Sequence, residues 1–166
     1  MTRFQFAMLA LWLSFTVLAF SYFINDKLKD FDADNKLANI TALSLAPQIR
    51  SFLSSDSAEN SIIHLSKKNC GCQATSEVHI QEINNIALVN HFNVINVVLE
   101  EHDTLPSTPS IAIINNAGEV IYYGPYGQGI ACSQTAGYAQ TVLKNYLKGY
   151  MSNIIIKEAK GCYCKL

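Results

Sequence analysis

Two cysteines separated by a single glycine are the residues of this chain most able to do chemistry. The segment reads Cys70-Gly71-Cys72 and follows the basic residues Lys67 and Lys68. A disulfide exchanger needs an accessible thiolate and a second sulfur within reach that resolves the mixed disulfide. We expect Cys70 to be the attacking thiolate, because the two lysines add positive potential beside it, and Cys72 to be the resolving cysteine. The sequence therefore predicts a catalytic pair at these two positions.

Three further cysteines leave the disulfide pattern open. Cys132 precedes the last expected helix, while Cys162 and Cys164 form a second Cys-x-Cys near the end of the sequence. If Cys70 and Cys72 pair with each other, at least one of the other three has no partner. A bridge from Cys132 to Cys162 or Cys164 would pin the tail to the domain as a structural element. The alternative is a relay, in which the tail passes electrons to the first pair.

Metal binding is a competing chemistry for the same residues. Two Cys-x-Cys pairs can offer four soft thiolates to Cu(I) or zinc, although they lie far apart in the sequence and lack the usual zinc spacing. His64 and His79 are near the first motif and can tune a thiolate or join a metal site, but a lone histidine is more often a packing residue. The principal interpretation therefore needs no metal and no other cofactor.

The first residues have the composition of a membrane anchor. From Phe4 to Ile24 there is no charged residue, and as a helix this run is roughly 31 Å long, close to the hydrocarbon thickness of a bilayer. We predict a transmembrane anchor at residues 1–24. The alternatives are a buried core helix, which would need a larger protein around it, and a signal peptide cleaved after Ala19, beyond which the apolar run continues.

Cysteine usage favours an exported domain. Flanking charge does not decide the orientation, because Arg3 on one side faces Lys27 and Lys29 on the other. All five cysteines follow the anchor, and this suits an oxidising compartment. We expect a single-pass protein of the cell (inner) membrane, with its soluble domain on the periplasmic or extracytoplasmic side. The 12 basic and 13 acidic side chains form no basic stripe, so nucleic-acid binding has no electrostatic support.

The rest of the chain divides into a polar segment and one domain. Residues 25–42 are rich in charge and are predicted to be a solvated stalk. Residues 43–166 suffice for a single domain with one core. Its first helix is expected at 47–53, with Pro47 in the first turn.

Apolar periodicity predicts an alternation of strands and helices in this domain. The expected elements are a strand at 61–65, a helix capped by Thr75 or Ser76 and ending at Val89, a strand at 94–99, a hairpin of strands at 110–114 and 119–123, a helix at 138–150 and an edge strand at 154–156. A strand, a crossover helix and a strand favour a parallel pair, and the hairpin adds an antiparallel pair. The fold class is therefore α/β, with a small mixed sheet and helices packed on it.

This arrangement resembles the thioredoxin superfamily. In that family a redox cysteine motif lies between the first core strand and its helix, and a cis-proline precedes a later strand. Cys70 and Cys72 fall at the first position, and Thr108-Pro109 falls at the second. The similarity covers roughly residues 61–150. It implies a thioredoxin-like three-layer domain in which Pro109 is cis and the backbone of Thr108 binds an extended substrate peptide.

The chain looks most like membrane-anchored thioredoxin-like proteins that end in a Gly-Cys-aromatic-Cys tail, here residues 161–164. This implies a membrane-tethered thiol-disulfide oxidoreductase or isomerase acting on exported protein thiols or on a redox partner protein. The usual motif has two residues between its cysteines, whereas this chain has only Gly71, so enzymatic activity stays open. The alternatives are a thiolate metal-binding (Cu or Zn) module and a non-catalytic thioredoxin-like interaction domain stabilised by disulfides.

Overall fold

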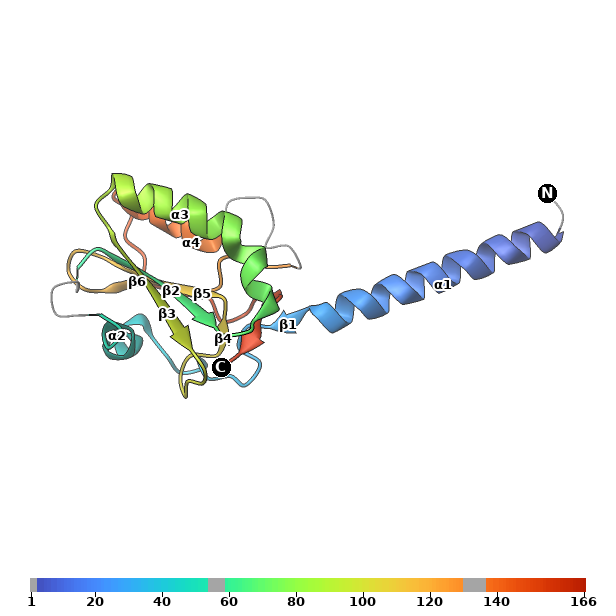
Figure 1. The fold of residues 1–166 in the computed structure, drawn as a ribbon, viewed down its shortest axis with the longest axis horizontal. Helices are drawn as coiled ribbons and strands as arrows, with labels where there is room; N and C mark the ends of the chain where they lie inside the picture. The colour runs from blue at the N-terminus through green and yellow to red at the C-terminus, as the bar shows by residue number, and fades with distance from the viewer. Residues whose placement is uncertain (1–2, 54–58, 130–136) are drawn as a thin grey trace.

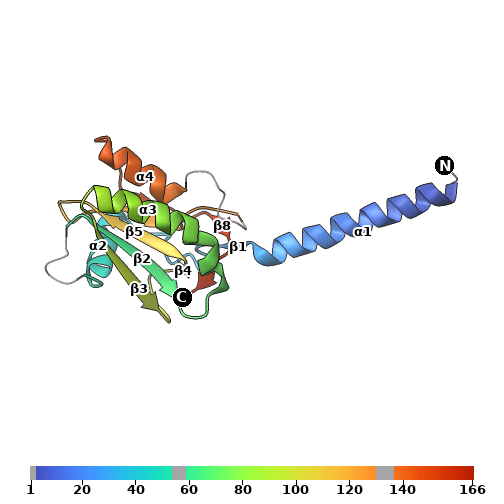
Figure 2. The same cartoon turned by 45° about the horizontal axis from the view of Figure 1, so that its top comes forward.

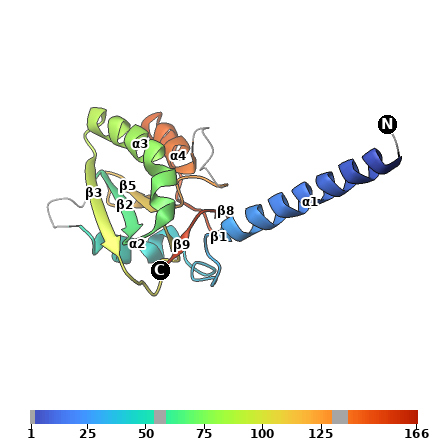
Figure 3. The ribbon, with the colours of Figure 1, turned by 45° about the vertical axis from the view of Figure 1, so that its right-hand side comes forward.

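The structure is a computed structural model that describes residues 3–53, 59–129 and 137–166, without the side chains of residues 25–27. One long helix, α1 (Arg3–Lys27), projects from a mixed α/β domain formed by the remaining chain. Figure 1, Figure 2 and Figure 3 show α1 as a single rod that leaves the domain beside strand β1.

Helix α1 has the length and composition of a membrane span. The segment Arg3–Ile24 has 22 residues, a mean hydropathy of 2.0 and none of its most apolar window buried against the described part of the chain. The alternative of a buried core helix is therefore wrong. A signal sequence near the N-terminus has the same length and apolar character as an anchor.

The domain is built on a five-stranded mixed sheet with the order β3-β2-β5-β6-β7. Strand β2 (Ser61–Lys67) is parallel to β3 (Asn93–Leu99) and antiparallel to β5 (Ser110–Ile114). Strands β5 and β6 (Val120–Gly124) form a hairpin, and β7 (Ile154–Ile155) is parallel to β6 at the edge. The prediction of a small mixed sheet is confirmed.

One face of the sheet is covered by helices α3 (Glu77–Val89) and α4 (Tyr138–Leu147), which lie side by side in Figure 1 and Figure 2. Their apolar faces pack on β2, β5 and β6 because apolar residues recur along each helix at the helical period. The buried side chains that the two helices contribute are Ile80, Ile83, Ala87, Ala139, Val142 and Leu143.

The opposite face is covered by α2 (Ala42–Arg50) and by segments from both ends of the domain. Phe31 and Leu37 are fully buried here, so the prediction of a solvated stalk at 25–42 does not describe this segment. The reason is that the Asp32 carboxylate accepts the backbone N–H groups of residues 36 and 37, each at 2.8 Å, and folds the charged segment into a turn. The apolar side chains of the segment then reach the core.

Helix α2 begins five residues earlier than expected. Thr41 caps it, since its side-chain oxygen accepts the Ser44 N–H at 3.2 Å and the Ser44 hydroxyl oxygen accepts the Thr41 N–H at 2.9 Å. Pro47 therefore lies inside the helix instead of in its first turn. The backbone carbonyl that its missing N–H would have bonded belongs to Leu43, a residue that is 85 % exposed.

Two short antiparallel pairs join the end of the chain to distant segments. Strand β1 (Lys29–Asp30) pairs with β8 (Lys160–Gly161), and β4 (Ser107–Thr108) pairs with β9 (Cys164–Lys165). Residues 160–165 therefore contact the chain just after α1 at one end and the strand that precedes β5 at the other. Figure 3 shows β9 near the C-terminus and β8 beside β1.

Candidate functional site

The first cysteine motif lies between β2 and α3, as predicted. The chain turns after β2 through Asn69, whose φ is 61°, and the Cys70 N–H donates to the Lys67 carbonyl at 3.2 Å. A 3-10 helix, η2 (Gly71–Ser76), then leads into α3. Cys70 is the residue before η2, and Cys72 lies within it, so the motif is placed where the first core strand ends.

The cysteines form two disulfides that each join one Cys-x-Cys motif to the other, and we call these two bonds crossed because neither lies within a motif. Cys70 is bonded to Cys164 with the Cα atoms 6.0 Å apart, and Cys72 is bonded to Cys162 with the Cα atoms 5.3 Å apart. Both separations lie in the usual disulfide range of about 4.4–6.8 Å. In this form of the protein Cys70 and Cys72 are therefore bonded to the tail and not to each other.

The crossed pattern has a geometric cause. The tail runs alongside the first motif, so two cysteines spaced by one residue in each segment face each other in opposite order. The expected bridge from Cys132 to Cys162 or Cys164 is wrong, because both tail cysteines are bonded to the first motif. Cys132 itself lies outside the described residues.

The sulfur atoms gather at one place beside β4. The Sγ atoms of Cys70, Cys72 and Cys164 all lie within 4.8 Å of one another, and Cys162 is joined to this group by its bond to Cys72. Cys70 Sγ lies 4.0 Å from the carbonyl oxygen of Thr108. This cluster is compatible with disulfide chemistry and, after reduction, with metal binding by thiolates.

Thr108 and Pro109 border this cluster. The peptide bond between them is cis, as the resemblance implied. Thr108 is fully buried and its backbone pairs with Cys164 of β9, in an antiparallel register that also pairs Ser107 with Lys165. The edge of β4 that the resemblance assigns to a substrate peptide is therefore occupied by the protein's own tail.

Side chains from several elements hold this tail in place. Lys67 Nζ donates to the carbonyl of Lys165 at 2.8 Å, and Lys36 Nζ donates to the carbonyl of Leu166 at 3.0 Å. The Leu166 N–H donates to the carbonyl of Pro106 at 2.9 Å, and the leucine side chain is buried. Lys67, which was predicted to support a thiolate at Cys70, thus contacts the backbone of the tail.

The Gly-Cys-Tyr-Cys sequence of the tail has a packing explanation. Tyr163 is buried between the two tail cysteines, and its hydroxyl donates to the carbonyl of Gly127 at 2.7 Å. A Cβ atom at Gly161 would lie 2.8 Å from the ring of Tyr163 and 3.1 Å from the carbonyl oxygen of Gly129. Glycine fits here because a side chain would have to displace the ring of Tyr163, whose hydroxyl is hydrogen-bonded.

The two histidines near the motif are buried and hydrogen-bonded. His64 Nε2 donates to Asn84 Oδ1 at 2.9 Å, and its Nδ1 accepts the Tyr126 hydroxyl at 2.6 Å. Burial lowers the pKa of His64 below its ordinary value, so the ring is neutral in this network. His79 is also buried, with Nδ1 3.1 Å from Gln140 Oε1.

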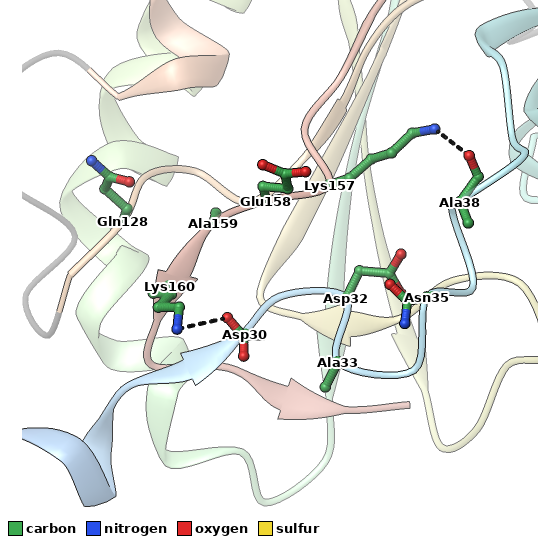
Figure 4. A pocket seen from close by; sticks show the side chains of 10 residues that line it. All are labelled: Asp30, Asp32, Ala33, Asn35, Ala38, Gln128, Lys157, Glu158, Ala159 and Lys160. Atoms are coloured by element: carbon green, nitrogen blue, oxygen red, sulfur yellow. Dashed lines mark hydrogen bonds and ion pairs between the residues drawn. The ribbon is translucent and has the colours of Figure 1, made fainter.

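A pocket of about 810 Å³ lies near the exit of α1, and Figure 4 shows its lining. Two of its lysines are engaged: Lys160 pairs with Asp30 at 3.4 Å, and Lys157 Nζ donates to the carbonyl of Ala38 at 3.0 Å. The Asp32 carboxylate is occupied by its two backbone N–H groups. The described lining residues include no cysteine, so this pocket is separate from the sulfur cluster.

Comparison with known families places the whole cysteine site in a recognised domain. The family described as Domain of unknown function (DUF6436) matches residues 39–166, which is well over half of the chain. The chain belongs to this family. The DUF6436 match begins just before α2 and includes both Cys-x-Cys motifs, β4 and Pro109. No curated protein and no solved structure matches the chain.

Sequence reasoning located the first motif and Pro109 but missed the residues that join the tail to it. The missed positions are those that bind the tail backbone, notably Lys36 and Lys67, together with the crossed bonding of the cysteines. The equal spacing of the two Cys-x-Cys motifs could have indicated this bonding, because two such motifs can bond pairwise when their segments run antiparallel. Nothing in the sequence indicated which strand the tail would pair with.

Proposed function

We propose that this DUF6436 protein is a membrane-tethered thiol-disulfide oxidoreductase or isomerase that acts on exported proteins through Cys70 and Cys72. The observation that supports it most is the position of Cys70 Sγ, which lies 4.0 Å from the carbonyl of Thr108 with Cys72 Sγ within 4.8 Å. A mixed disulfide at Cys70 can therefore form beside a backbone edge, with a resolving sulfur next to it.

The reaction has two exchanges. In the reduced form the Cys70 thiolate attacks one sulfur of a substrate disulfide, forms a mixed disulfide and releases the other substrate sulfur as a thiolate. The Cys72 thiolate then attacks Cys70 Sγ, forms the Cys70–Cys72 bond and releases the first substrate sulfur as a thiolate. The protein is oxidised by two electrons and the substrate disulfide is reduced by two. The reverse sequence oxidises a substrate dithiol.

The proposed fold is thioredoxin-like. The order of elements from β2 through α3, β3, β5 and β6 to α4 supports this, with the cysteine motif after β2 and a cis-proline before β5. Two layers of helix and chain on the sheet agree with the three-layer domain that the resemblance implies. In this interpretation Thr108 and Pro109 form the substrate-binding edge.

The proposed location is the cell (inner) membrane, with α1 as a single-pass anchor and the domain on the periplasmic or extracytoplasmic side. Support comes from the apolar length of α1 and from the two disulfides, because such bonds persist in oxidising compartments. The partners in this setting are exported protein thiols or a redox partner protein.

Metal binding is the second candidate function, and the sulfur cluster supports it. A zinc ion binds thiolate sulfurs at about 2.3 Å, so three sulfurs within 4.8 Å of one another need only small shifts to share one ion. Both disulfides must first be reduced, because only thiolates are ligands. Stoichiometric Zn or Cu(I) in the reduced full chain, lost in Cys162→Ser/Cys164→Ser, would favour this module over the enzyme.

The decisive experiment uses the full chain in detergent with insulin reduction and refolding of a scrambled disulfide protein as assays. Cys70→Ser should abolish activity. The matched control is Cys164→Ser, which breaks the same bridge but leaves the attacking cysteine intact, and it should keep activity. If the wild type and both variants are inert, the enzyme proposal is wrong and a non-catalytic interaction domain stabilised by disulfides is favoured.

A further inference from the structure

The tail of this protein lies where a disulfide-bonded peptide substrate would lie. Strand β9 pairs antiparallel with β4, and the residue opposite Thr108 is Cys164. That same cysteine is bonded to Cys70. The tail therefore combines the two features of a mixed-disulfide complex, a backbone strand on the β4 edge and a sulfur bond to the attacking cysteine.

We propose that residues 161–166 are an internal occupant of the β4 edge, held closed by the crossed disulfides, and that a thiol opens the site by converting them to Cys70–Cys72 and Cys162–Cys164. This inference rests on the proposed function, because it treats β4 and Cys70 as the substrate site. It adds how access to that site is regulated and which class of peptide replaces the tail.

The contacts of the tail define that class of peptide. Lys67 and Lys36 donate to main-chain carbonyls of residues 165 and 166, and the Pro106 carbonyl accepts a main-chain N–H. Such contacts are available to any extended segment, whatever its side chains. The incoming partner is therefore an extended polypeptide segment with a cysteine at the position that Cys164 now occupies.

The conversion needs one thiolate and three exchanges that balance. An external thiolate attacks Cys162 Sγ, bonds to it and releases Cys72 as a thiolate. The Cys72 thiolate attacks Cys70 Sγ, forms the Cys70–Cys72 bond and releases Cys164 as a thiolate. Cys164 then attacks Cys162 Sγ, closes the tail pair and returns the external thiolate. No electrons are gained or lost, so the external thiol is a catalyst.

The geometry favours Cys72 as the internal attacker. Its Sγ lies within 4.8 Å of both sulfurs of the Cys70–Cys164 bond. Cys162, the cysteine that the external thiol attacks, is half-buried, so this end of the cluster is partly exposed to an approaching thiol. Once the crossed bonds are gone, the described tail is held by noncovalent contacts, which compete directly with an incoming strand.

Disulfide mapping tests the conversion without an activity assay. The full chain in detergent, with Cys132→Ser to remove the fifth cysteine, is treated with substoichiometric glutathione, alkylated in acid-quenched denaturant and digested with trypsin without reduction. Trypsin cuts after Lys68, Lys160 and Lys165, so the crossed form joins the tail fragment 161–165 to the fragment that begins at residue 69. The isomer releases the tail fragment alone.

We expect more free tail fragment than the glutathione added, because each thiol is returned. The control adds Cys72→Ser and Cys162→Ser, which leaves the Cys70–Cys164 bond without an internal attacker, so release should not exceed the glutathione. If the first protein also releases no more tail than the thiol supplied, the conversion does not occur and the inference is wrong.

Amide hydrogen exchange tests whether the released tail leaves β4. In the isomer we expect loss of protection at Lys165 and Leu166, with α3 and α4 unchanged. Protection that persists at the tail would show that the site stays closed, which overturns the inference. Insulin reduction by wild type together with failed conversion would leave the proposed function intact, whereas conversion without any external activity would count against that function alone.

Discussion

The two faces of the sheet are covered in different ways. Helices α3 and α4 cover one face, and each presents an apolar stripe that repeats within a short stretch of sequence. The other face is covered by α2 and by segments 28–41 and 159–166, which come from opposite ends of the domain. One face therefore depends on local periodicity, and the other depends on bringing distant chain segments together.

This difference has an energetic meaning. Segments that are far apart in sequence lose more conformational entropy when they meet than neighbouring turns of one helix do. The second face, called the tail face below, compensates with contacts that the described residues of the helical face lack: two disulfides to the tail, and lysine side chains that bind its backbone. We therefore expect the free energy of unfolding to depend strongly on the two disulfides that bind the tail to this face.

The largest effect should follow removal of both crossed disulfides. Both bridges close long loops, with sequence separations of 94 and 90 residues. Closing such a loop in the unfolded chain is worth about 4–5 kcal/mol. The variant with all four bonded cysteines changed to serine should lose about this much free energy of unfolding, measured by urea denaturation of the full chain.

The paired double variants sharpen this test. Cys70→Ser/Cys164→Ser and Cys72→Ser/Cys162→Ser each keep one bridge, which still closes nearly the whole loop. Each should therefore cost much less than the quadruple variant. Losses in the two double variants that add up to the loss in the quadruple variant would mean that the bridges act through local packing and not through loop closure.

The next effect should come from Phe31. Its ring is fully buried and contacts the ring of Tyr163 edge-on, with 5.3 Å between centroids. Phe31→Ala should lower the free energy of unfolding by about 3–5 kcal/mol, because it leaves a cavity under the tail. Phe31→Leu is the control and should cost clearly less. A solvated stalk would instead make Phe31→Ala neutral, so an unchanged urea midpoint would refute the packing of this segment.

A smaller effect is expected at Asp32, which accepts two backbone N–H groups and shapes the turn behind Phe31. Asp32→Ala should cost about 0.5–2 kcal/mol, the range seen when a helix-capping side chain is lost. Asp34→Ala removes an ion pair to Lys165 at 2.7 Å that is open to water, and it should cost only about 0–1 kcal/mol. Equal losses of free energy for Asp32→Ala and Asp34→Ala would show that the negative charge of Asp32, and not its hydrogen bonds to the turn, accounts for its contribution to stability.

The smallest effect concerns acid stability on the helical face. Burial lowers the pKa of His64 in the folded protein below its ordinary value of 6.5. Protonation is then easier in the unfolded chain, so stability is full above pH 6.5 and falls as the pH drops through the unfolded pKa. The variant His64→Gln should show a weaker fall between neutral and mildly acidic pH in thermal melts.

His102 also has a lowered pKa, with burial as the main cause, so part of the acid dependence should persist in that variant. Because His102 titrates in both proteins, the contribution of His64 is the difference between the pH profiles of wild type and His64→Gln. An identical pH profile in the two proteins would mean that His64 has no share in the acid response.

Sequence alone determined the features that repeat over short distances. The apolar run of α1, the alternation of β2, α3 and β3, the β5–β6 hairpin and the edge strand β7 follow from periodicity and turn residues, which act among neighbours in the chain. It also placed Cys70 and Cys72 at the end of β2, because a motif between a strand and a helix has one position in such a fold.

The tertiary structure alone decided how the ends of the domain are used. The charges of residues 25–42 indicated a solvated segment, yet Asp32 turns the chain so that Phe31 and Leu37 enter the core. Five cysteines permitted many pairings, and only the antiparallel approach of the tail selected Cys70–Cys164 and Cys72–Cys162. The composition of a segment indicates whether it favours contact with water. The disulfide partner of a cysteine about 90 residues away depends instead on the packing of the whole domain.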